Sequence, residues 1–195
     1  MILSRQFFQQ STLCVAEQLI GKELIREHSG IRLVGKIVET EAYIGKNDSA
    51  CHASKGLTPR TKVMFGEAGR AYVYFVYGMH FMFNIVTEEK GFPAAVLIRG
   101  VEPIEGLEKM KQLRNCQLNQ LTNGPAKFCQ AFAIDKNLNG WDLTLGDVLW
   151  LEEALTPTEF SIKHTTRVGI GYADKIDQAK KWRFYMKNNA FISRK

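Results

Sequence analysis

The hydrophobic and polar positions of the first seventy residues predict one helix and a pair of strands. Apolar residues recur at helical spacing over 12–20, with Ser11 as a candidate N-cap and Gly21 as a helix stop. Two strand-like runs follow at 23–26 and 31–43, and the dipeptide Ser29-Gly30 predicts a turn between them. A polar, turn-rich segment then extends to residue 70, where Thr58-Pro59 predicts the start of a short helix.

The second part of the chain predicts a hairpin, further strands and two helices. Residues 71–77 are β-branched and aromatic, Gly78 interrupts them, and 80–87 resumes the pattern, so we expect a hairpin with its tip near 77–79. Other predicted elements are strands at 94–101, 148–151 and 160–172 and helices at 105–116 and 125–134. With no repeat or low-complexity linker, residues 1–195 predict a single α+β domain, a curved, mainly antiparallel sheet flanked by helices.

The composition excludes several classes of protein. No apolar run approaches the roughly 20 residues of a membrane span, and the N-terminus lacks a secretory signal pattern, so we expect a cytoplasmic protein, nucleoid-associated if bacterial. The four cysteines form no C-x-x-C pair and are expected to be free thiols. The four histidines show no ligand spacing, so no metal site is predicted.

Net charge gives a first indication of a partner. The chain has 26 Lys and Arg against 20 Asp and Glu, and residues 174–195 carry most of the +6 excess. Such a segment favours polyanions through counterion release, although a solubilising surface has the same composition. Charge alone does not distinguish DNA, RNA and an acidic lipid surface.

One strand carries a candidate catalytic pattern. Alternation over 37–43 places Glu39, Glu41 and Tyr43 on one face, which suits a general base and equally suits a solvated face. The pattern does not distinguish one glutamate from the other. Arg99 ends an apolar strand and requires an anionic partner, either structural, at Glu102 or Glu105, or a catalytic carboxylate with which it would hold a water.

Aromatic residues concentrate in the predicted hairpin. Tyr72 and Tyr74 share one strand face, while Phe75 and Tyr77 share the other. Most such rings form core, but tyrosines that line a groove can stack on nucleobases, and an aromatic at a hairpin tip is suited to wedge between bases. The sequence has neither a G-x-S-x-G nor a phosphate-binding G-x-x-x-x-G-K motif, which weakens a serine hydrolase or NTPase interpretation.

Several segments together form a more specific pattern. They are V-E-T-E-A-Y-I-G at 38–45, His52 with T-P-R at 58–60, M-F at 64–65, Y-V-Y-F-V-Y-G-M at 72–79 with Asn84, L-I-R at 97–99 with E-P-I-E-G at 102–106, N-G-P-A-K at 123–127, R-V-G at 167–169 and R-F-Y at 183–185. In order and spacing they resemble the alkyladenine DNA glycosylase family (3-methyladenine DNA glycosylases of the mammalian type, with many bacterial members). Departures from the family pattern are Cys51, Thr61 and Gly100, which stands where Ala is common.

The resemblance implies a function and a set of roles. The protein would be a monofunctional DNA glycosylase of base-excision repair that flips alkylated or deaminated purines, of the 3-methyladenine and hypoxanthine type, out of duplex DNA. It would hydrolyse their N-glycosidic bond and leave an abasic site. Glu41 would activate the attacking water and Arg99 would position it. The substrate-binding residues would be Tyr43 and Tyr74 on the faces of the base, His52 at its edge and Asn84 at the pocket floor, and the DNA contacts Tyr77, Met79, Lys127 and Arg167.

The same resemblance limits cofactors and partners. No metal or organic cofactor is implied. The partner would be double-stranded DNA containing damaged purines, the protein would act as a monomer, and no membrane partner is expected. Two other functions fit parts of the sequence. One is a non-catalytic nucleic-acid-binding module that uses the basic C-terminal segment and the tyrosine-lined cleft, and the other is a hydrolase of free nucleosides.

Overall fold

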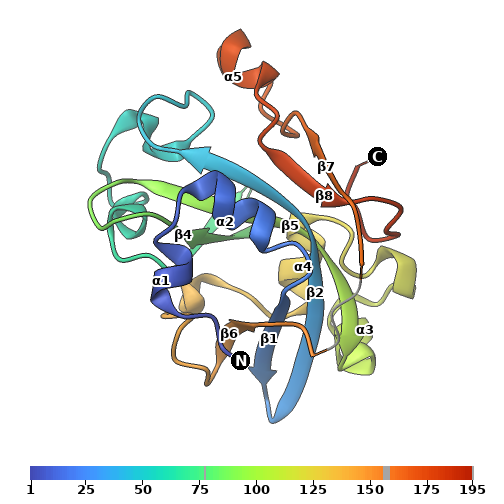
Figure 1. Cartoon of the computed structure of the whole chain (residues 1–195). Helices are drawn as coiled ribbons and strands as arrows, with labels where there is room; N and C mark the ends of the chain where they lie inside the picture. The colour runs from blue at the N-terminus through green and yellow to red at the C-terminus, as the bar shows by residue number, and fades with distance from the viewer. Residues whose placement is uncertain (77, 156–158, 195) are drawn as a thin grey trace.

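A long strand, β2 (Ile31–Ile44), organises the sheet. The computed structural model describes residues 1–76, 78–155 and 159–194, and these contain an eight-stranded antiparallel sheet (Figure 1). Along one edge, residues 34–44 of β2 pair with β5 (Ala94–Glu105), and on the opposite edge residues 31–36 pair with β1 (Glu23–His28). On the same edge as β1, residues 39–41 pair with β8 (Arg183–Met186), so this stretch has a strand on each side.

The remaining strands extend the sheet from these four. The main path runs β3-β4-β5-β2-β1-β6, and β7 pairs with β8 beside it. The bounds are Ala71–Val76 for β3, His80–Val86 for β4, Leu149–Glu152 for β6 and Ile162–Thr165 for β7. The sheet is therefore built around β2 and β5, the two strands that carry the candidate acids and arginine.

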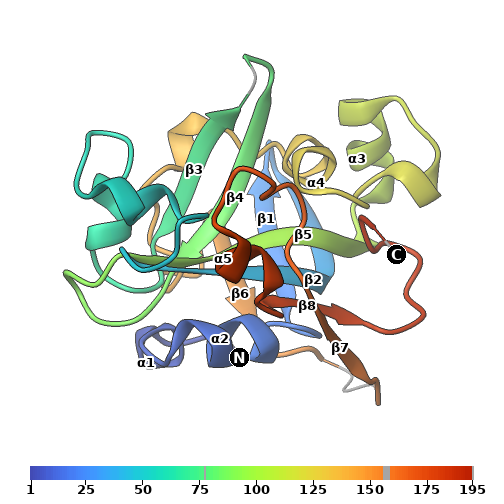
Figure 2. The same ribbon diagram turned by 90° about the horizontal axis from the view of Figure 1, so that it is seen from above.

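Helices cover both faces of the sheet. α2 (Thr12–Gln18) packs on β2 and β5 from one side, and α4 (Pro125–Ala131) packs on β4 and β5 from the other (Figure 2). Other helices in the described residues are α1 (Arg5–Phe8), α3 (Leu107–Arg114), α5 (Lys175–Ala179) and the short 3-10 helices His52–Lys55, Lys62–Phe65, Leu118–Gln120 and Lys136–Leu138. Within the described residues, no helix is long and apolar enough to cross a bilayer.

Aromatic packing fixes α4 on the sheet. Pro125 occupies the first turn of α4, where its missing N–H leaves no hydrogen bond unmade. The rings of Phe128 and Phe132 in and after this helix lie edge to face with a centroid separation of 5.5 Å, and Phe128 meets Phe83 of β4 at 6.0 Å. All three side chains are fully buried, so they anchor the helix that covers the far side of β4 and β5.

The predicted α+β fold with a mainly antiparallel sheet is confirmed, and so are the turn at Ser29-Gly30 and the hairpin of β3 and β4. The helix predicted to open at Thr58-Pro59 is wrong, since a short 3-10 helix begins instead at Lys62. Hydrogen bonds between Thr58 and Thr61 hold the intervening residues in a turn. The strand predicted over 160–172 ends at Thr165, and β8 and the helices α1 and α5 escaped prediction because each is only four or five residues long.

Replacement of Gly100 by alanine should destabilise the protein. A Cβ on Gly100 would lie 2.6 Å from the backbone oxygen of Phe191, so the segment after β8 would have to shift. Overpacking of this kind costs about 1–3 kcal/mol. Urea unfolding should therefore give a lower free energy of unfolding for Gly100→Ala. The control is Gly171→Ala, where an added Cβ meets nothing within 4 Å. Equal stability of the two variants would contradict the expected clash.

Candidate active site

Two acidic side chains of β2 lie in the protein interior. Glu39 and Glu41 are both 0% exposed, so the solvated-face interpretation of this strand does not hold. The flanking strands supply cations, because Arg99 ends the apolar run of β5 and Arg183, in β8, stands opposite Glu41. The antiparallel register thus places two guanidinium groups beside two carboxylates.

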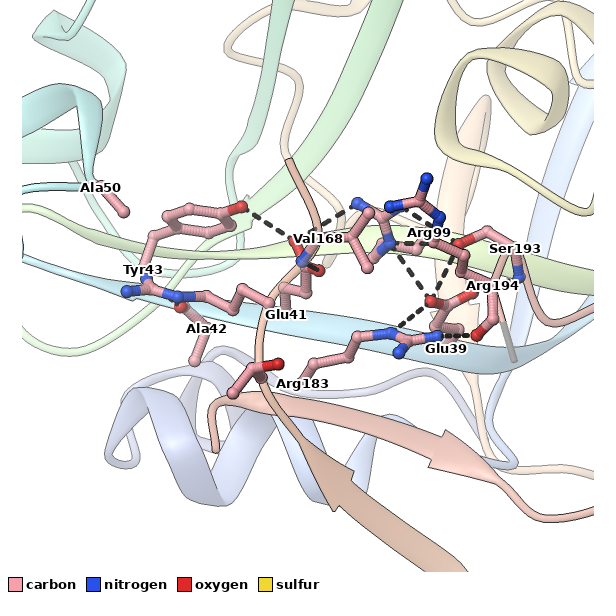
Figure 3. A network of polar contacts seen from close by, with 12 residues as sticks. Glu39, Glu41, Ala42, Tyr43, Ala50, Arg99, Val168, Arg183, Ser193 and Arg194 are labelled. Atoms are coloured by element: carbon pink, nitrogen blue, oxygen red, sulfur yellow. Dashed lines mark hydrogen bonds and ion pairs between the residues drawn. The ribbon is translucent and has the colours of Figure 1, made fainter. Parts of the chain in front are cut away.

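Arg99 joins both glutamates. Its Nη1 donates to Glu41 Oε2 at 3.3 Å, and its Nε donates to Glu39 Oε1 at 3.2 Å (Figure 3). Of the partners left open by the sequence, the arginine takes the β2 carboxylates, while Glu102 accepts a hydrogen bond from Asn189 instead. Arg99 is therefore tied to the candidate base and to its neighbour at the same time.

Glu41 has a defined hydrogen-bond shell. Its Oε1 accepts the backbone N–H of Val168 at 2.6 Å, and its Oε2 accepts the hydroxyl of Tyr43 at 2.8 Å. Burial raises the pKa of Glu41, and the charge of Arg99 together with these two hydrogen bonds opposes that rise. The result is a desolvated carboxylate of increased basicity, which is what a general base requires.

Glu39 accepts more hydrogen bonds than Glu41 does. Arg183 Nε donates to its Oε1 at 2.7 Å, and Ser193 donates both its backbone N–H, at 2.6 Å, and its hydroxyl, at 2.9 Å. Two carboxylates and two guanidinium groups balance in charge, and this allows all four to be buried. Arg183 also donates to the backbone oxygen of Arg194, so the segment after β8 closes over this group.

The basic C-terminal segment is accordingly less available to a polyanion than its composition indicates. Arg183 is buried with Glu39, and Lys180 forms an ion pair with Asp177 at 2.6 Å. Charge counting could not separate these ion-paired cations from the unpaired ones.

A small cavity lies next to the charged group and is called the aromatic cavity here. It is lined by Tyr43, Ala50, His52, Met64, Tyr72, Tyr74, Asn84, Ala95 and Tyr172. The four predicted substrate-binding residues, Tyr43, His52, Tyr74 and Asn84, are therefore brought together from β2, the following loop, β3 and β4. The cavity encloses about 40 Å³, and the His52 and Tyr74 rings that wall it are 4.5 Å apart between centroids.

Histidine 52 is an uncharged wall of this cavity. Burial, reinforced by the nearby cations Arg60 and Lys55, lowers the pKa of His52 to about 4, so the ring is neutral at pH 7. Its Nδ1 lies 3.0 Å from the hydroxyl of Tyr72, and burial raises the pKa of that hydroxyl to about 12. The wall therefore offers neutral aromatic surface and polar edges without a positive charge of its own.

Tyr43 connects the aromatic cavity with the buried charges. Its ring lines the cavity while its hydroxyl bonds to Glu41, so one side chain separates the carboxylate from the cavity. Asn84 is fixed by a hydrogen bond from its Nδ2 to the backbone oxygen of Tyr72 at 3.1 Å. The arrangement can present a planar aromatic ligand to a desolvated base.

Arg167, a predicted DNA contact, lies in the interior. Its guanidinium forms a two-point ion pair with Asp48, at 2.6 and 2.8 Å, and donates to the backbone oxygen of Ala42 at 2.9 Å. It also lies 4.8 Å from the ring centroid of Tyr43. Because the side chains of both ion-pair partners are 0% exposed, Arg167 has no surface to offer a phosphate, and it holds the loop that presents Val168.

The other predicted DNA contacts are placed differently. Met79 lies at the tip of the β3–β4 hairpin and is 68% exposed. Lys127 lies in the first turn of α4 and donates to Asn123 Oδ1 at 2.8 Å. Tyr77 lies outside the described residues.

Some site residues were not predicted. Tyr172 and Met64 line the aromatic cavity from distant loops, and Asp48, Val168 and Ser193 support the buried charges. Strand alternation does link Tyr72 with Tyr74, but nothing local in the sequence marks the loop residues. Within the residues the structure describes, no three His, Cys, Asp or Glu side chains gather as metal ligands would.

Comparison with known proteins adds independent findings. The family model described as methylpurine-DNA glycosylase matches residues 6–190. A protein of Carboxydothermus hydrogenoformans named "Putative 3-methyladenine DNA glycosylase" is 48% identical over the full length of both chains. Proteins with the same name from Methanocella arvoryzae and Clostridium acetobutylicum are 47% and 46% identical, covering 100% and 99% of this chain and 96% and 98% of their own.

Loss of the Asp48 charge should destabilise the fold strongly. Asp48→Asn would leave the buried Arg167 guanidinium without its counter-ion, and breaking a buried ion pair in this way costs about 3–5 kcal/mol. Chemical denaturation should register the loss as an earlier unfolding midpoint. Glu108→Gln removes the partner of Lys111 in an exposed pair and should leave the midpoint unchanged. A midpoint for Asp48→Asn equal to that of Glu108→Gln would show that the Arg167 pair contributes no stability.

Proposed function

The chain belongs to the methylpurine-DNA glycosylase family, and from that premise we propose that it removes damaged purines from duplex DNA with Glu41 as the general base. The substrates are alkylated or deaminated purines of the 3-methyladenine and hypoxanthine type. The products are the free base and an abasic site. The observation that carries the proposal is a fully buried carboxylate, bound by Arg99 and separated from an aromatic cavity only by Tyr43.

A base inside a duplex is out of reach of this carboxylate, so the nucleotide must first leave the stack. Extrusion costs a few kcal/mol and is least costly for a damaged or mispaired base, which supplies part of the selectivity. The resemblance gives the vacated space to Tyr77, which lies outside the described residues, and its neighbour Met79 at the hairpin tip is exposed. Lys127 is a candidate contact to the DNA backbone. The partner is therefore double-stranded DNA.

The aromatic cavity has to widen to admit the everted base. Its volume of about 40 Å³ matches one water molecule, whose share of liquid volume is about 30 Å³. A purine is larger than this volume, so its entry requires the walls of the cavity to move apart. Binding energy from the rest of the DNA is the source of free energy for that movement.

The walls favour cationic lesions. The electron-rich rings of Tyr43 and Tyr74 attract cations, as Arg167 and Arg60 at 4.8 and 5.0 Å from their centroids show, and the neutral His52 does not repel a positively charged base. Asn84 lies at the cavity wall, where a guanine 2-amino group would have to fit. The cavity thus distinguishes lesions both by charge and by shape.

The proposed chemical step uses one general base from this chain and requires no cofactor. As the bond between C1′ and the purine nitrogen breaks, its electron pair leaves with the purine and positive charge develops on the sugar. A cationic lesion such as 3-methyladenine leaves as the neutral base, whereas a neutral lesion such as hypoxanthine must also gain a proton as it leaves. Water adds its oxygen to C1′ and gives its proton to Glu41, whose negative charge also stabilises the sugar cation. Arg99 orients the carboxylate through Nη1. Hydrolysis leaves an abasic site without a covalent enzyme–DNA intermediate.

Glu41→Gln should abolish base release while duplex binding persists. Loss of the general base reduces the rate by about 10²–10⁴-fold. The measurement is single-turnover release from an oligonucleotide with one hypoxanthine, with affinity measured by fluorescence anisotropy. Glu105→Gln, an exposed change at the end of β5, is the matched control and should retain full activity.

Other results would exclude the proposal. Full activity of Glu41→Gln would favour a non-catalytic binding module or a different base. Turnover of free methylated nucleosides without any dependence on a duplex would favour a nucleoside hydrolase. Covalent capture of damaged DNA by borohydride would replace simple hydrolysis with a lyase mechanism.

The pH dependence should follow the charge of Glu41. The carboxylate must be ionised to accept a proton, and burial raises its pKa, so activity should be lost as pH falls through a value above the ordinary glutamate pKa of about 4.3. His52, with a pKa of about 4, should add no step near the ordinary histidine value of about 6.5. Single-turnover rates between pH 4 and 9 test both statements. If a His52→Gln variant shows the same loss of rate at low pH, that loss does not arise from titration of His52.

A further inference from the structure

The second acid of the E-T-E pattern has no part in the proposed hydrolysis. Glu39 is fully buried and does not line the aromatic cavity, so nothing places it against the everted purine. It nevertheless binds the same arginine as Glu41. We propose that Glu39 is a positioning residue that shares Arg99 with Glu41 and so limits how far this guanidinium neutralises the general base. This inference rests on the proposed role of Glu41.

The hydrogen bonds show how Arg99 distributes its donor groups between the two glutamates. Arg99 gives Nη1 to Glu41, and it gives Nε to Glu39 and to the hydroxyl of Ser193. Its Nη2 also donates to that hydroxyl at 3.1 Å. Only one edge of the Arg99 guanidinium therefore faces Glu41, the proposed general base. A two-point pair with Glu41 would hold the carboxylate more strongly and make it a poorer proton acceptor.

Arg183 keeps this division in place from the opposite strand. It donates to the same Glu39 Oε1 that Arg99 binds, so two cations compete for one carboxylate oxygen (Figure 3). Without Arg183, Glu39 would have Arg99 as its one cationic partner among the described residues. Glu39 would then attract the Arg99 guanidinium more strongly and draw it away from Glu41. Without the charge of Glu39, both cations would be free to act on Glu41.

The groups that face Glu41 from every packed element are few. On β2 they are Glu39 and Tyr43, on β5 Arg99, on β8 Arg183 and on β3 Tyr74. The loop after β7 contributes the Val168 N–H, Arg167 and Tyr172. Glu39 is the one other carboxylate of this set. Its charge contributes to the raised pKa of Glu41, in the direction that the shared arginine predicts.

Two substitutions should move the pH profile in opposite directions. Glu39→Gln removes a like charge and releases Arg99, so the acid limb of single-turnover base release should move to lower pH and the plateau rate should fall as the base weakens. Arg183→Gln removes a cation and leaves Arg99 to Glu39, so the limb should move to higher pH. We expect shifts of about half a unit to one unit, equal to about threefold to tenfold in rate at a fixed pH on the limb.

Controls separate positioning from folding. Arg183→Lys keeps the positive charge and should restore the limb, while Glu105→Gln should leave it unchanged. Affinity for the damaged duplex should stay constant throughout, since none of these residues lines the aromatic cavity. Both buried variants are expected to unfold at lower temperature, so melting temperature is not the readout, and Arg183→Gln alone tests the sign if Glu39→Gln does not fold.

The outcomes are distinguishable from failure of the proposed function. Opposite shifts support the inference. An unchanged limb in the folded variants, or shifts of the same sign, would overturn it while leaving Glu41 as the base. Complete loss of release in Glu39→Gln at every pH, together with activity in Glu41→Gln, would instead identify Glu39 as the base and overturn both.

Discussion

Burial of two carboxylates on one strand is the constraint that shapes this protein. An isolated ion in a protein interior carries a penalty of several kcal/mol, so Glu39 and Glu41 require cations and hydrogen-bond donors placed around them. The sheet supplies these from β5 and β8, the two strands that flank this part of β2, and the segment after β8 completes the shell through Ser193. Strand order, register and the path of the C-terminal segment all serve this charge balance.

The same constraint gives the methylpurine-DNA glycosylase fold its chemistry. A carboxylate held away from water is a stronger base than one on the surface, and Tyr43 connects it to the aromatic cavity, the proposed place for the purine. Arg167 stands behind Tyr43 and fixes the loop that donates the Val168 N–H, so the aromatic wall and the base are held by one buried ion pair. Binding surface and reaction centre therefore share their supports.

Local features of the sequence were the ones that could be predicted. The hairpin of β3 and β4 depends on neighbouring residues, and strand alternation correctly placed Glu41 on the side of β2 that carries Tyr43, to which it is hydrogen-bonded. Partners distant in sequence were predicted less well: for Arg99 a catalytic carboxylate was one of the alternatives left open, whereas nothing pointed to Arg183, which reaches Glu39 across a separation of 144 residues. The sequence around Arg167 is typical of a surface loop, and only its ion pair with Asp48 explains why the Arg167 side chain is buried.

The contact between Ser193 and Glu39 spans 154 residues and has a consequence for biogenesis. A chain emerging from the ribosome exposes its acidic pair long before segment 183–194 has been synthesised. Until that segment docks, strand β2 has no complete set of counter-charges, and the acids stay hydrated. The charge-balanced group therefore cannot be completed until segment 183–194 is available to dock.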